Sequence, residues 1–417
     1  MKRKSIFYSL IFLFIISLTA CASTKAEVID KVEPVQSEKI VDTTIQTTEK
    51  EAKAKKAHAK KSSISLLFGG DIMAHNENYR VDDFSKIWKN VLNLTGENDL
   101  VFANIESPVD TTKNIASYPY FNMSKKYLSA AIDAGFNVFS LSNNHSGDQG
   151  LSGIQETEKT VEALKKEAEE KHKALYFSGL KNGPEANYTY NLIKKNDWTI
   201  LFLPVTELLN LYENKNYINY TVNSKEGREK LIQYCEKLRK ENPCDLFILS
   251  FHTSEDEYVR EYTREQTDFY KKLLDAGVDI LWANHAHIIK DRKIIINTKN
   301  NTQKIIMYGN GNTISGQRRA PVLSQKNPNG ERDNTGDGIL YKVIFTKDEN
   351  HPNPVISFAK PYFITTYINT ANHFILQKLD DEFIDYLYNV PRKDWAEYIS
   401  RRKKINEDYT KDLIEWE

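Results

Sequence analysis

Acidic, amide and imidazole side chains follow a series of apolar segments in this chain, each at the point where the apolar run stops. In chain order they are Asp71, Asn104, Glu106, Asn144 with His145, His252, His285 with His287, and Asn310. Carboxylate oxygens and imidazole nitrogens together suit Mn, Fe, Zn and similar divalent ions, and the lack of thiolates argues against a structural zinc site. The residue types therefore predict a centre that binds divalent metal ions.

Short apolar runs alternate with amphipathic stretches from residue 64 onward, which predicts an α/β sheet covered by helices on both faces. The expected strands are Ile64–Phe68, Leu100–Ala103, Val138–Leu141, Leu175–Phe177, Thr199–Val205, Leu246–Phe251, Val278–Ala283 and Lys304–Tyr308. Ligands of open α/β sheets bind at the carboxyl ends of strands, so we expect the polar side chains to converge on one edge. His285 and His287 occupy alternate positions after a strand, which directs both imidazoles to one side.

Other patterns predict the surrounding elements. Ser152 to Gln155 has the pattern of a capping box that starts a helix, and Gly277 ends a helix that starts at Arg264. Residues 338–345 and 354–359 predict a β-hairpin. The polar segment 372–417 is expected to be a helical appendage without a chemical role.

The N-terminus has the pattern of a signal peptide over residues 1–21. A basic start, Lys2 to Lys4, precedes the apolar run Ile6–Leu18, which is shorter than the ~20 residues of a membrane-spanning helix. The sequence Leu18-Thr-Ala-Cys21 then resembles the lipobox of bacterial lipoproteins, in which the Cys is acylated. The resemblance implies that Cys21 anchors an extracytoplasmic protein to a bacterial membrane. The alternative is an ordinary signal peptide with an incidental Cys.

Composition limits the remaining possibilities. Residues 22–62 contain no aromatic residue and are expected to form a disordered tether. The chain has 57 Lys and Arg against 57 Asp and Glu, so it has no basic excess for binding nucleic acid. Cys235 and Cys244 either pair in an oxidising compartment or remain free thiols, and the sequence leaves both open.

The order of the polar positions resembles the metallophosphoesterase superfamily, in which Asp ends the first strand, an acid the second and Asn-His the third, followed by a lone His and His-x-His. A closer resemblance is to the CapA family of bacterial poly-γ-glutamate capsule synthesis proteins. It covers residues 64–368 and rests on Phe68-Gly-Gly-Asp71, Ala103-Asn-Ile-Glu106-Ser-Pro, Ser142-Asn-Asn-His145-Ser-Gly-Asp148-Gln-Gly150, His252, Glu257-Tyr258, Leu274-Asp-Ala-Gly277-Val-Asp279, His285-Ala-His287 and Tyr308-Gly-Asn310.

The resemblance implies a four-layer α/β/β/α sandwich of the metallophosphatase type over residues 63–368, with a C-terminal β-hairpin and a helical tail in 369–417. It implies two divalent ions, with Glu106 bridging, held by Asp71, Glu106, Asn144, His252, His285 and His287. His145 would donate a proton or stabilise charge, and Asp148 would orient it. Asn104 would position Glu106 or contact the substrate, and Glu257 and Asn310 would contact the substrate.

Three departures from the family pattern predict divergence in substrate or weaker metal binding. The superfamily's Asp-x-His on the first strand is Asp71-Ile-Met73 here, and we expect His75 to be a loop residue. The segment after His252 is one residue longer than in the family and lacks Trp-Gly. Asn284 stands where the family's Gly-His-His-Pro-His has a His.

The resemblance predicts a surface metallohydrolase that makes, trims or exports an anionic extracellular polymer, by attack of a metal-activated water on an amide or ester bond. Its expected partners are that polymer or other capsule-synthesis proteins, and the membrane through the anchor. Two alternatives stay open. One is a non-catalytic subunit for capsule assembly or export, and the other is an extracytoplasmic metallophosphoesterase.

Overall fold

The computed structural model of the protein describes residues 61–319, 321, 331–349 and 351–417. Residues Ala59–Glu417 form one compact unit. The expected signal peptide, Cys21 and the tether up to residue 60 lie outside the described residues. Among the described helices, none combines the length and the apolar character needed to cross a membrane.

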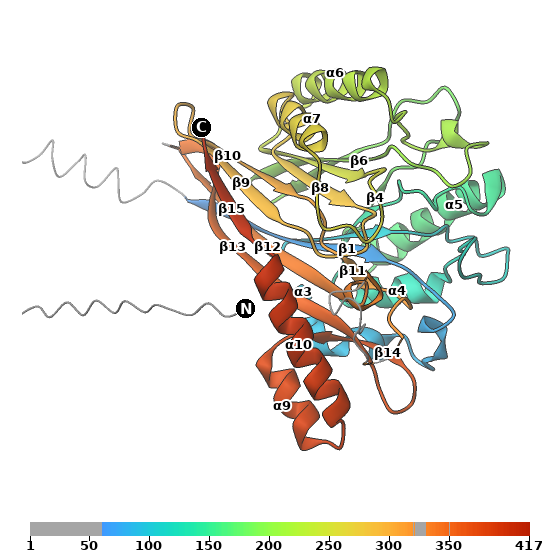
Figure 1. Ribbon diagram of the computed structural model, residues 1–417. Coiled ribbons are helices and arrows are strands. Elements are labelled where there is room, and N and C mark those ends of the chain that lie inside the picture. Colours follow the sequence, from blue (N-terminus) through green and yellow to red (C-terminus); the bar gives the residue numbers. More distant parts are fainter. Residues whose placement is uncertain (1–60, 320, 322–330, 350) are drawn as a thin grey trace, which may run out of the picture. The chain divides into compact units, whose positions relative to one another are not determined.

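The described strands form two sheets (Figure 1). The first has the order β14 (Phe374–Lys378), β13 (His351–Ile368), β12 (Asp337–Asp348), β1 (Ser62–Ile72), β2 (Leu100–Ile105), β3 (Val138–Ser140) and β4 (Tyr176–Ser178), and β11 (Asn312–Ile314) also pairs with β1. The second has the order β15 (Asp412–Trp416), β9 (Arg292–Asn297), β10 (Thr302–Met307), β8 (Ile280–Asn284), β7 (Leu246–His252), β6 (Trp198–Thr206) and β5 (Asn191–Lys195).

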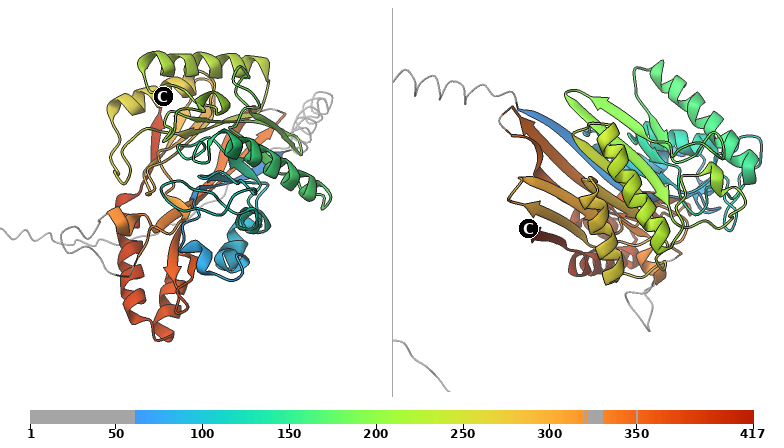
Figure 2. Two further views of the ribbon diagram at one scale, coloured as in Figure 1. Left: turned by 90° about the vertical axis from the view of Figure 1, so that its right-hand side faces the viewer. Right: turned by 90° about the horizontal axis from the view of Figure 1, so that it is seen from above.

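A helical layer covers the outer face of each sheet, and α6 and α7 lie together in every view (Figures 1 and 2). The longer helices are α4 (Lys125–Asp133), α5 (Gly150–Glu169), α6 (Lys225–Glu241), α7 (Arg264–Asp275), α9 (Asp381–Asn389) and α10 (Lys393–Tyr409). The short ones are η1 (Asn78–Arg80), α2 (Ser85–Trp88), η2 (Lys89–Val91), α3 (Leu92–Thr95), η3 (Lys215–Tyr217) and α8 (Glu331–Asn334).

Three apolar clusters hold these layers together. Aromatic rings from both sheets meet between the sheets, where Phe102 stacks on Phe68 at 4.5 Å and meets Phe202 edge-on at 5.6 Å. Helices α4 and α5 cover the first sheet, and α6 and α7 cover the second. Burying each large apolar side chain contributes about 1.5–3 kcal/mol. The arrangement is the four-layer α/β/β/α sandwich that the motifs implied.

The structure confirms the eight expected strands to within a few residues and the β-hairpin, which is β12 and β13. The capping box is wrong. Helix α5 already begins at Gly150, because a turn in which the Gly150 N–H bonds to the Gly147 carbonyl at 2.8 Å leads directly into it. Ser152 therefore lies within the first turn rather than at the cap. Cys235 and Cys244 are both free thiols.

The segment after residue 368 is only partly helical, which corrects the expectation of a purely helical appendage. Helices α9 and α10 lie side by side (Figure 1), but β14 extends the first sheet and β15 extends the second. β15 pairs in parallel with β9 from Asp412 to Trp416. This polar sequence forms strands because each finds a sheet edge with free backbone groups.

Candidate metal centre

Two glycines at the end of β1 set the position of Asp71. The register between β1 and β2 shifts just before Asp71, which marks an irregularity at Gly69 and Gly70. A Cβ on Gly70 would lie 1.8 Å from the carbonyl oxygen of Gly311, so no larger residue fits there. Asp71 is buried, and its Oδ1 accepts a hydrogen bond from Asn104 Nδ2 at 2.8 Å. The strand end therefore holds this carboxylate in a defined orientation.

Glu106 and His287 meet Asp71 from the ends of other strands. The Nδ1 of His287 lies 3.2 Å from Asp71 Oδ2 and 3.0 Å from Asn312 Oδ1. Its Nε2 lies 3.6 Å from Glu106 Oε1. Glu106 follows β2 in the first sheet, whereas His287 follows β8 in the second. The centre is therefore assembled across the two sheets.

Asn144, His252 and His285 form the other half of the centre. The Nε2 of His252 lies 2.9 Å from Asn144 Oδ1, and the ring centroids of His252 and His285 are 5.0 Å apart. His285 and His287 have φ angles of 102° and 56°. A non-glycine residue in this left-handed region costs about 1–3 kcal/mol, and such strain is concentrated at functional sites.

Several atoms in this cluster that could bind a metal ion are buried and have no hydrogen bond. They are both carboxylate oxygens of Glu106 and the Nδ1 atoms of His252 and His285. Ligand atoms of Glu106, His285 and His287 lie within 4.8 Å of one another, and so do those of Asp71, Glu106 and His252. A buried carboxylate is costly unless a cation or donor satisfies it. The donor set therefore fits divalent metal ions, with Glu106 common to both groups.

Electrostatics favour the same conclusion. Burial and the neighbouring imidazoles lower the pKa of His252 well below its usual value and that of His285 to about 4, so both rings are neutral at pH 7. Burial and Asp71 raise the pKa of Glu106 well above its usual value. Burial alone would lower the pKa of His287, but Glu106 and Asp71 outweigh it and raise this pKa to about 10. The pocket thus favours positive charge beside its two carboxylates.

His145 is held beside this cluster by hydrogen bonds with two neighbours. Its Nδ1 lies 2.6 Å from Asp148 Oδ2, which also accepts the Phe121 N–H at 2.8 Å. Asn210 Nδ2 lies 3.2 Å from Nδ1 and 3.4 Å from Nε2 of the same ring. The Asn210 N–H also donates to the carbonyl of Asn144 at 2.9 Å. An acceptor at Nδ1 fixes the tautomer, which leaves Nε2 to exchange a proton with a reacting group.

A cavity of about 680 Å³ opens beside the cluster. Its lining includes Met73, His75, Arg80, His145, Glu257, Tyr258, His287 and Arg319. His75 lies in the loop after β1, as expected, and its Nδ1 accepts the Gly316 N–H at 3.1 Å. The catalytic candidate His145 and the ligand candidate His287 therefore border one space large enough for a substrate.

Comparison with known proteins identifies the family. The family model described as bacterial capsule synthesis protein PGA_cap matches residues 65–317. The chain belongs to this family. The resemblance that its motifs indicated is thereby confirmed.

Two curated relatives of this PGA_cap chain are also similar. It is 26% identical over 336 residues to the capsule biosynthesis protein CapA of Bacillus anthracis, a match that covers 76% of this chain and 75% of the relative. It is 24% identical over 262 residues to the PGA biosynthesis protein CapA of Bacillus subtilis strain 168, covering 61% and 64%. A solved phosphatase from Mycoplasma pneumoniae is 15% identical with a TM-score of 0.44, covering 79% of this chain and 99% of that one.

Two of the predicted substrate contacts in this PGA_cap chain, Asn104 and Asn310, have hydrogen-bond partners inside the protein. Asn104 is fully buried, and its amide orients Asp71 instead of facing the cavity. Asn310 is 1% exposed and donates to the carbonyls of Phe68 at 3.2 Å and Gly69 at 2.9 Å, so it supports the bend of β1. Glu257, by contrast, lines the cavity. Polar side chains at the strand ends therefore either face the site or form hydrogen bonds that hold the site residues and the backbone around them in position.

Asn210 and Asn312 were not predicted from the sequence. Asn210 follows β6 and contacts both His145 and Asn144. The Oδ1 of Asn312 accepts a hydrogen bond from His287 Nδ1, and its Nδ2 donates to Gln317 Oε1 at 2.8 Å. The rule that polar residues follow strands would have selected Asn210, whereas Asn312 lies within β11, a strand that the sequence pattern did not reveal.

Proposed function

We propose that this capsule-family protein is a metal-dependent hydrolase that acts outside the cytoplasm on an anionic polymer, poly-γ-glutamate by family likeness. The bond cleaved is an amide or ester bond of that polymer. The observation that carries the proposal is Glu106, whose two buried oxygens have no hydrogen bond and lie among Asp71, His252, His285 and His287. Carboxylates and imidazoles grouped in this way are a typical ligand set for divalent metal ions.

The residues of the chain divide into binding and proton-transfer roles in this proposal. Asp71, Glu106, Asn144, His252, His285 and His287 would hold the ions. Divalent ions supply Lewis-acid polarisation of the scissile group and lower the pKa of a water molecule. Asp148 accepts a hydrogen bond from His145 Nδ1–H, and His145, when protonated on both nitrogens, gives its Nε2 proton to the leaving group. The side chain of Glu257 in the cavity wall orients the substrate.

Membrane anchoring at Cys21 is part of the proposal. Its support is the lipobox-like Leu18-Thr-Ala-Cys21 after a short apolar run. A tether of residues 22–62 would have a flexible reach of about 35 Å, which places the hydrolase near extracellular polymer. Labelling of cells with a radioactive fatty acid tests this point: the wild-type chain should be labelled, and the Cys21→Ser chain should not.

The decisive experiment measures hydrolysis with metal content. The purified full chain, loaded with Mn, Fe or Zn, is incubated with poly-γ-glutamate and, in parallel, with a model phosphodiester. We expect shortening of poly-γ-glutamate by the wild type and at least a hundredfold slower reaction for Glu106→Gln. Hydrolysis of the phosphodiester alone would replace the proposal with an extracytoplasmic metallophosphoesterase.

One observation favours a second candidate, a non-catalytic subunit of capsule assembly. Met73 occupies the position of the superfamily's second ligand on the first strand, and its buried thioether borders the cavity. A variant with Asp71→Ala and His287→Ala distinguishes the two. Capsule polymer formed normally in cells with this folded variant would favour the subunit, and its loss would favour the hydrolase.

A further inference from the structure

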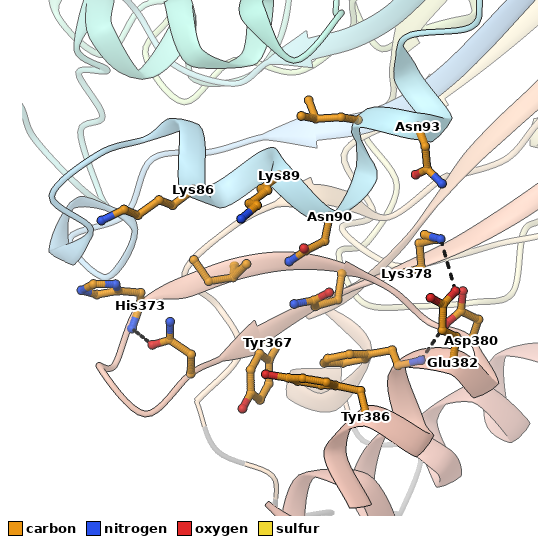
Figure 3. Close-up of a pocket in the computed structure, with 15 residues that line it drawn as sticks. Lys86, Lys89, Asn90, Asn93, Tyr367, His373, Lys378, Asp380, Glu382 and Tyr386 are labelled. Atoms are coloured by element: carbon orange, nitrogen blue, oxygen red, sulfur yellow. Dashed lines mark hydrogen bonds and ion pairs between the residues drawn. The ribbon is translucent and has the colours of Figure 1, made fainter. Parts of the chain in front are cut away.

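A second, open groove lies away from the metal ligands and has a volume of about 750 Å³ (Figure 3). One wall consists of the short helices α2, η2 and α3, and the other of β14 and α9. In Figure 3, Lys89, Asn90 and Asn93 project from the first wall toward the second. None of the proposed metal ligands or proton-transfer residues lines this groove.

The floor of the groove is apolar. Tyr367, Ile375 and Phe383 are each no more than 7% exposed and line the groove. Leu92, 44% exposed, and Tyr386, 54% exposed, also line it. Rigid aromatic and aliphatic surfaces of this kind pack against the methylene groups of a ligand.

The charged residues around the groove are largely occupied with one another. Lys86 pairs with Asp82 at 2.7 Å, and Lys378 with Glu382 at 3.7 Å. Asp380 caps α9 by accepting the Phe383 N–H. Among the lysines of the groove, these contacts leave Lys89 without an ion pair in the described residues.

Four polar side chains in the groove are uncommitted: Lys89, Asn90, Asn93 and Gln377. In the part of the chain that the structure describes, none of them forms a side-chain hydrogen bond or ion pair. They offer one ammonium group and three amides. Amides donate to and accept from other amides, and the ammonium pairs with a carboxylate. The complementary ligand carries amides, methylene groups and carboxylates along one chain.

The groove adjoins the cavity at the metal centre through the connection between β13 and β14. Asn369 and His373 in this connection line the groove, whereas Asn372 and Phe374 line the cavity beside His145. An extended polyamide spans about 3.3–3.6 Å per α-linked residue and more for a longer repeat. A polymer chain that follows this connection therefore contacts both sites.

We propose that this groove is a second binding site, which holds a remote stretch of an acidic polyamide while another stretch lies at the metal centre. The inference rests on the proposed function, because the second stretch is placed where hydrolysis is proposed. Linked binding at two sites raises affinity without new contacts at either one. Long chains should therefore bind more tightly than short ones, and the groove should account for the difference in affinity.

The test is titration of the detergent-solubilised full chain, kept on ice, with poly-γ-glutamate of about 50 residues and with its trimer. The groove variant is Lys89→Ala with Tyr386→Ala. The matched control is Lys404→Ala with Tyr388→Ala, because Lys404 is exposed and Tyr388 is a 53% exposed neighbour on α9, and neither lines the groove. We expect at least tenfold weaker binding of the long polymer by the groove variant alone. The trimer should bind all three proteins equally.

Equal binding of the long polymer by the groove variant and the control would overturn the inference, as would competition by neutral dextran at the same concentration. Asn93→Glu provides a second variant in case the double variant fails to fold. An added carboxylate at this position of the groove should repel the acidic polymer and weaken its binding. In a separate experiment the wild-type chain is loaded with metal and incubated with the same polymer at room temperature, and polymer length is then measured. Groove-dependent binding without shortening refutes hydrolysis and supports the groove, whereas shortening without groove dependence supports hydrolysis and refutes the groove.

Discussion

The Nδ1 atom of His145 lies 2.6 Å from the Oδ2 atom of Asp148, three residues further along the turn that leads into α5. The same oxygen accepts the Phe121 N–H, so the carboxylate is held by two donors. Burial raises the pKa of Asp148, and the hydrogen bond from His145 opposes that rise. The pair has the geometry of an imidazole whose tautomer is set by a carboxylate.

Replacement of Asp148 by Asn should leave metal binding intact and slow hydrolysis. A neutral amide at this position accepts a weaker hydrogen bond from His145 Nδ1–H than a carboxylate does. We therefore expect kcat to fall by about 10²–10⁴, the usual contribution of general acid–base catalysis. Metal content and turnover of the purified variant check this prediction. Asp268→Asn, at an exposed position on α7, serves as the control. An unchanged kcat would remove Asp148 from the mechanism.

Asn210→Ala should weaken catalysis more mildly. Its amide contacts both nitrogens of His145, and one hydrogen bond is worth about 1 kcal/mol, so kcat should fall about five- to tenfold. The pH–rate profile should also change, because Asn210 contacts the imidazole that is proposed to transfer the proton. A loss of thermal stability with no change in this profile would indicate a purely structural role.

The metal-free chain should lose stability as the pH falls from about 6.5 to about 4, in part through His285. Its folded pKa of about 4 is below the ordinary value of 6.5, because burial disfavours the charged ring. Between these values the unfolded chain binds a proton that the folded chain does not, so folding is penalised. Urea denaturation at pH 7 and pH 4 should show a drop smaller by about 3 kcal/mol for His285→Gln than for the wild type. Equal drops would contradict the lowered pKa.

Asp337 is not one of the proposed metal ligands, but it should be essential for the stability of the fold. It is fully buried and accepts from Arg318 at 2.6 Å and Arg402 at 2.7 Å, which joins the loop before α8 to α10. Burial would raise its pKa, but the two guanidinium groups outweigh burial and lower it to about 2.

Asp337→Ala leaves two buried cations without their partner and should cost about 3–5 kcal/mol in the free energy of unfolding. The wild-type contribution of Asp337 is present above pH 3.8 and is lost as the pH falls toward 2. Chemical denaturation measures both effects. The exposed control Asp385→Ala should change stability by no more than about 0.5 kcal/mol, and a similar value for Asp337→Ala would refute the prediction.

Much of the fold was predictable because the apolar strands are short, buried and separated by amphipathic helices. The sequence also predicted which polar residues follow the strands, and the structure brings Asp71, Glu106 and His287 within hydrogen-bonding or ion-pair reach. Periodicity does not reveal how strands from distant parts of the chain pair. For that reason β5, β9, β11, β14 and β15 were missed.

The sequence also did not predict which asparagine side chains contact the site and which support the backbone. Asn104 and Asn310 follow strands just as Asn144 does, yet they bond to Asp71 and to the backbone of β1. Which role an amide takes depends on the local bend at Gly70, where two backbones meet closely. A one-dimensional pattern does not contain this geometry.

The central claim is that Asp71, Glu106, Asn144, His252, His285 and His287 bind divalent ions, and elemental analysis tests it most directly. The full chain is loaded separately with Mn, Fe and Zn, dialysed, and measured by mass spectrometry alongside Glu106→Ala and the control Asp268→Ala. We predict about two ions per chain for the wild type and the control, by the two-metal arrangement, and at most one for Glu106→Ala. A wild-type chain that retains no ion under any of these loading conditions would contradict the account.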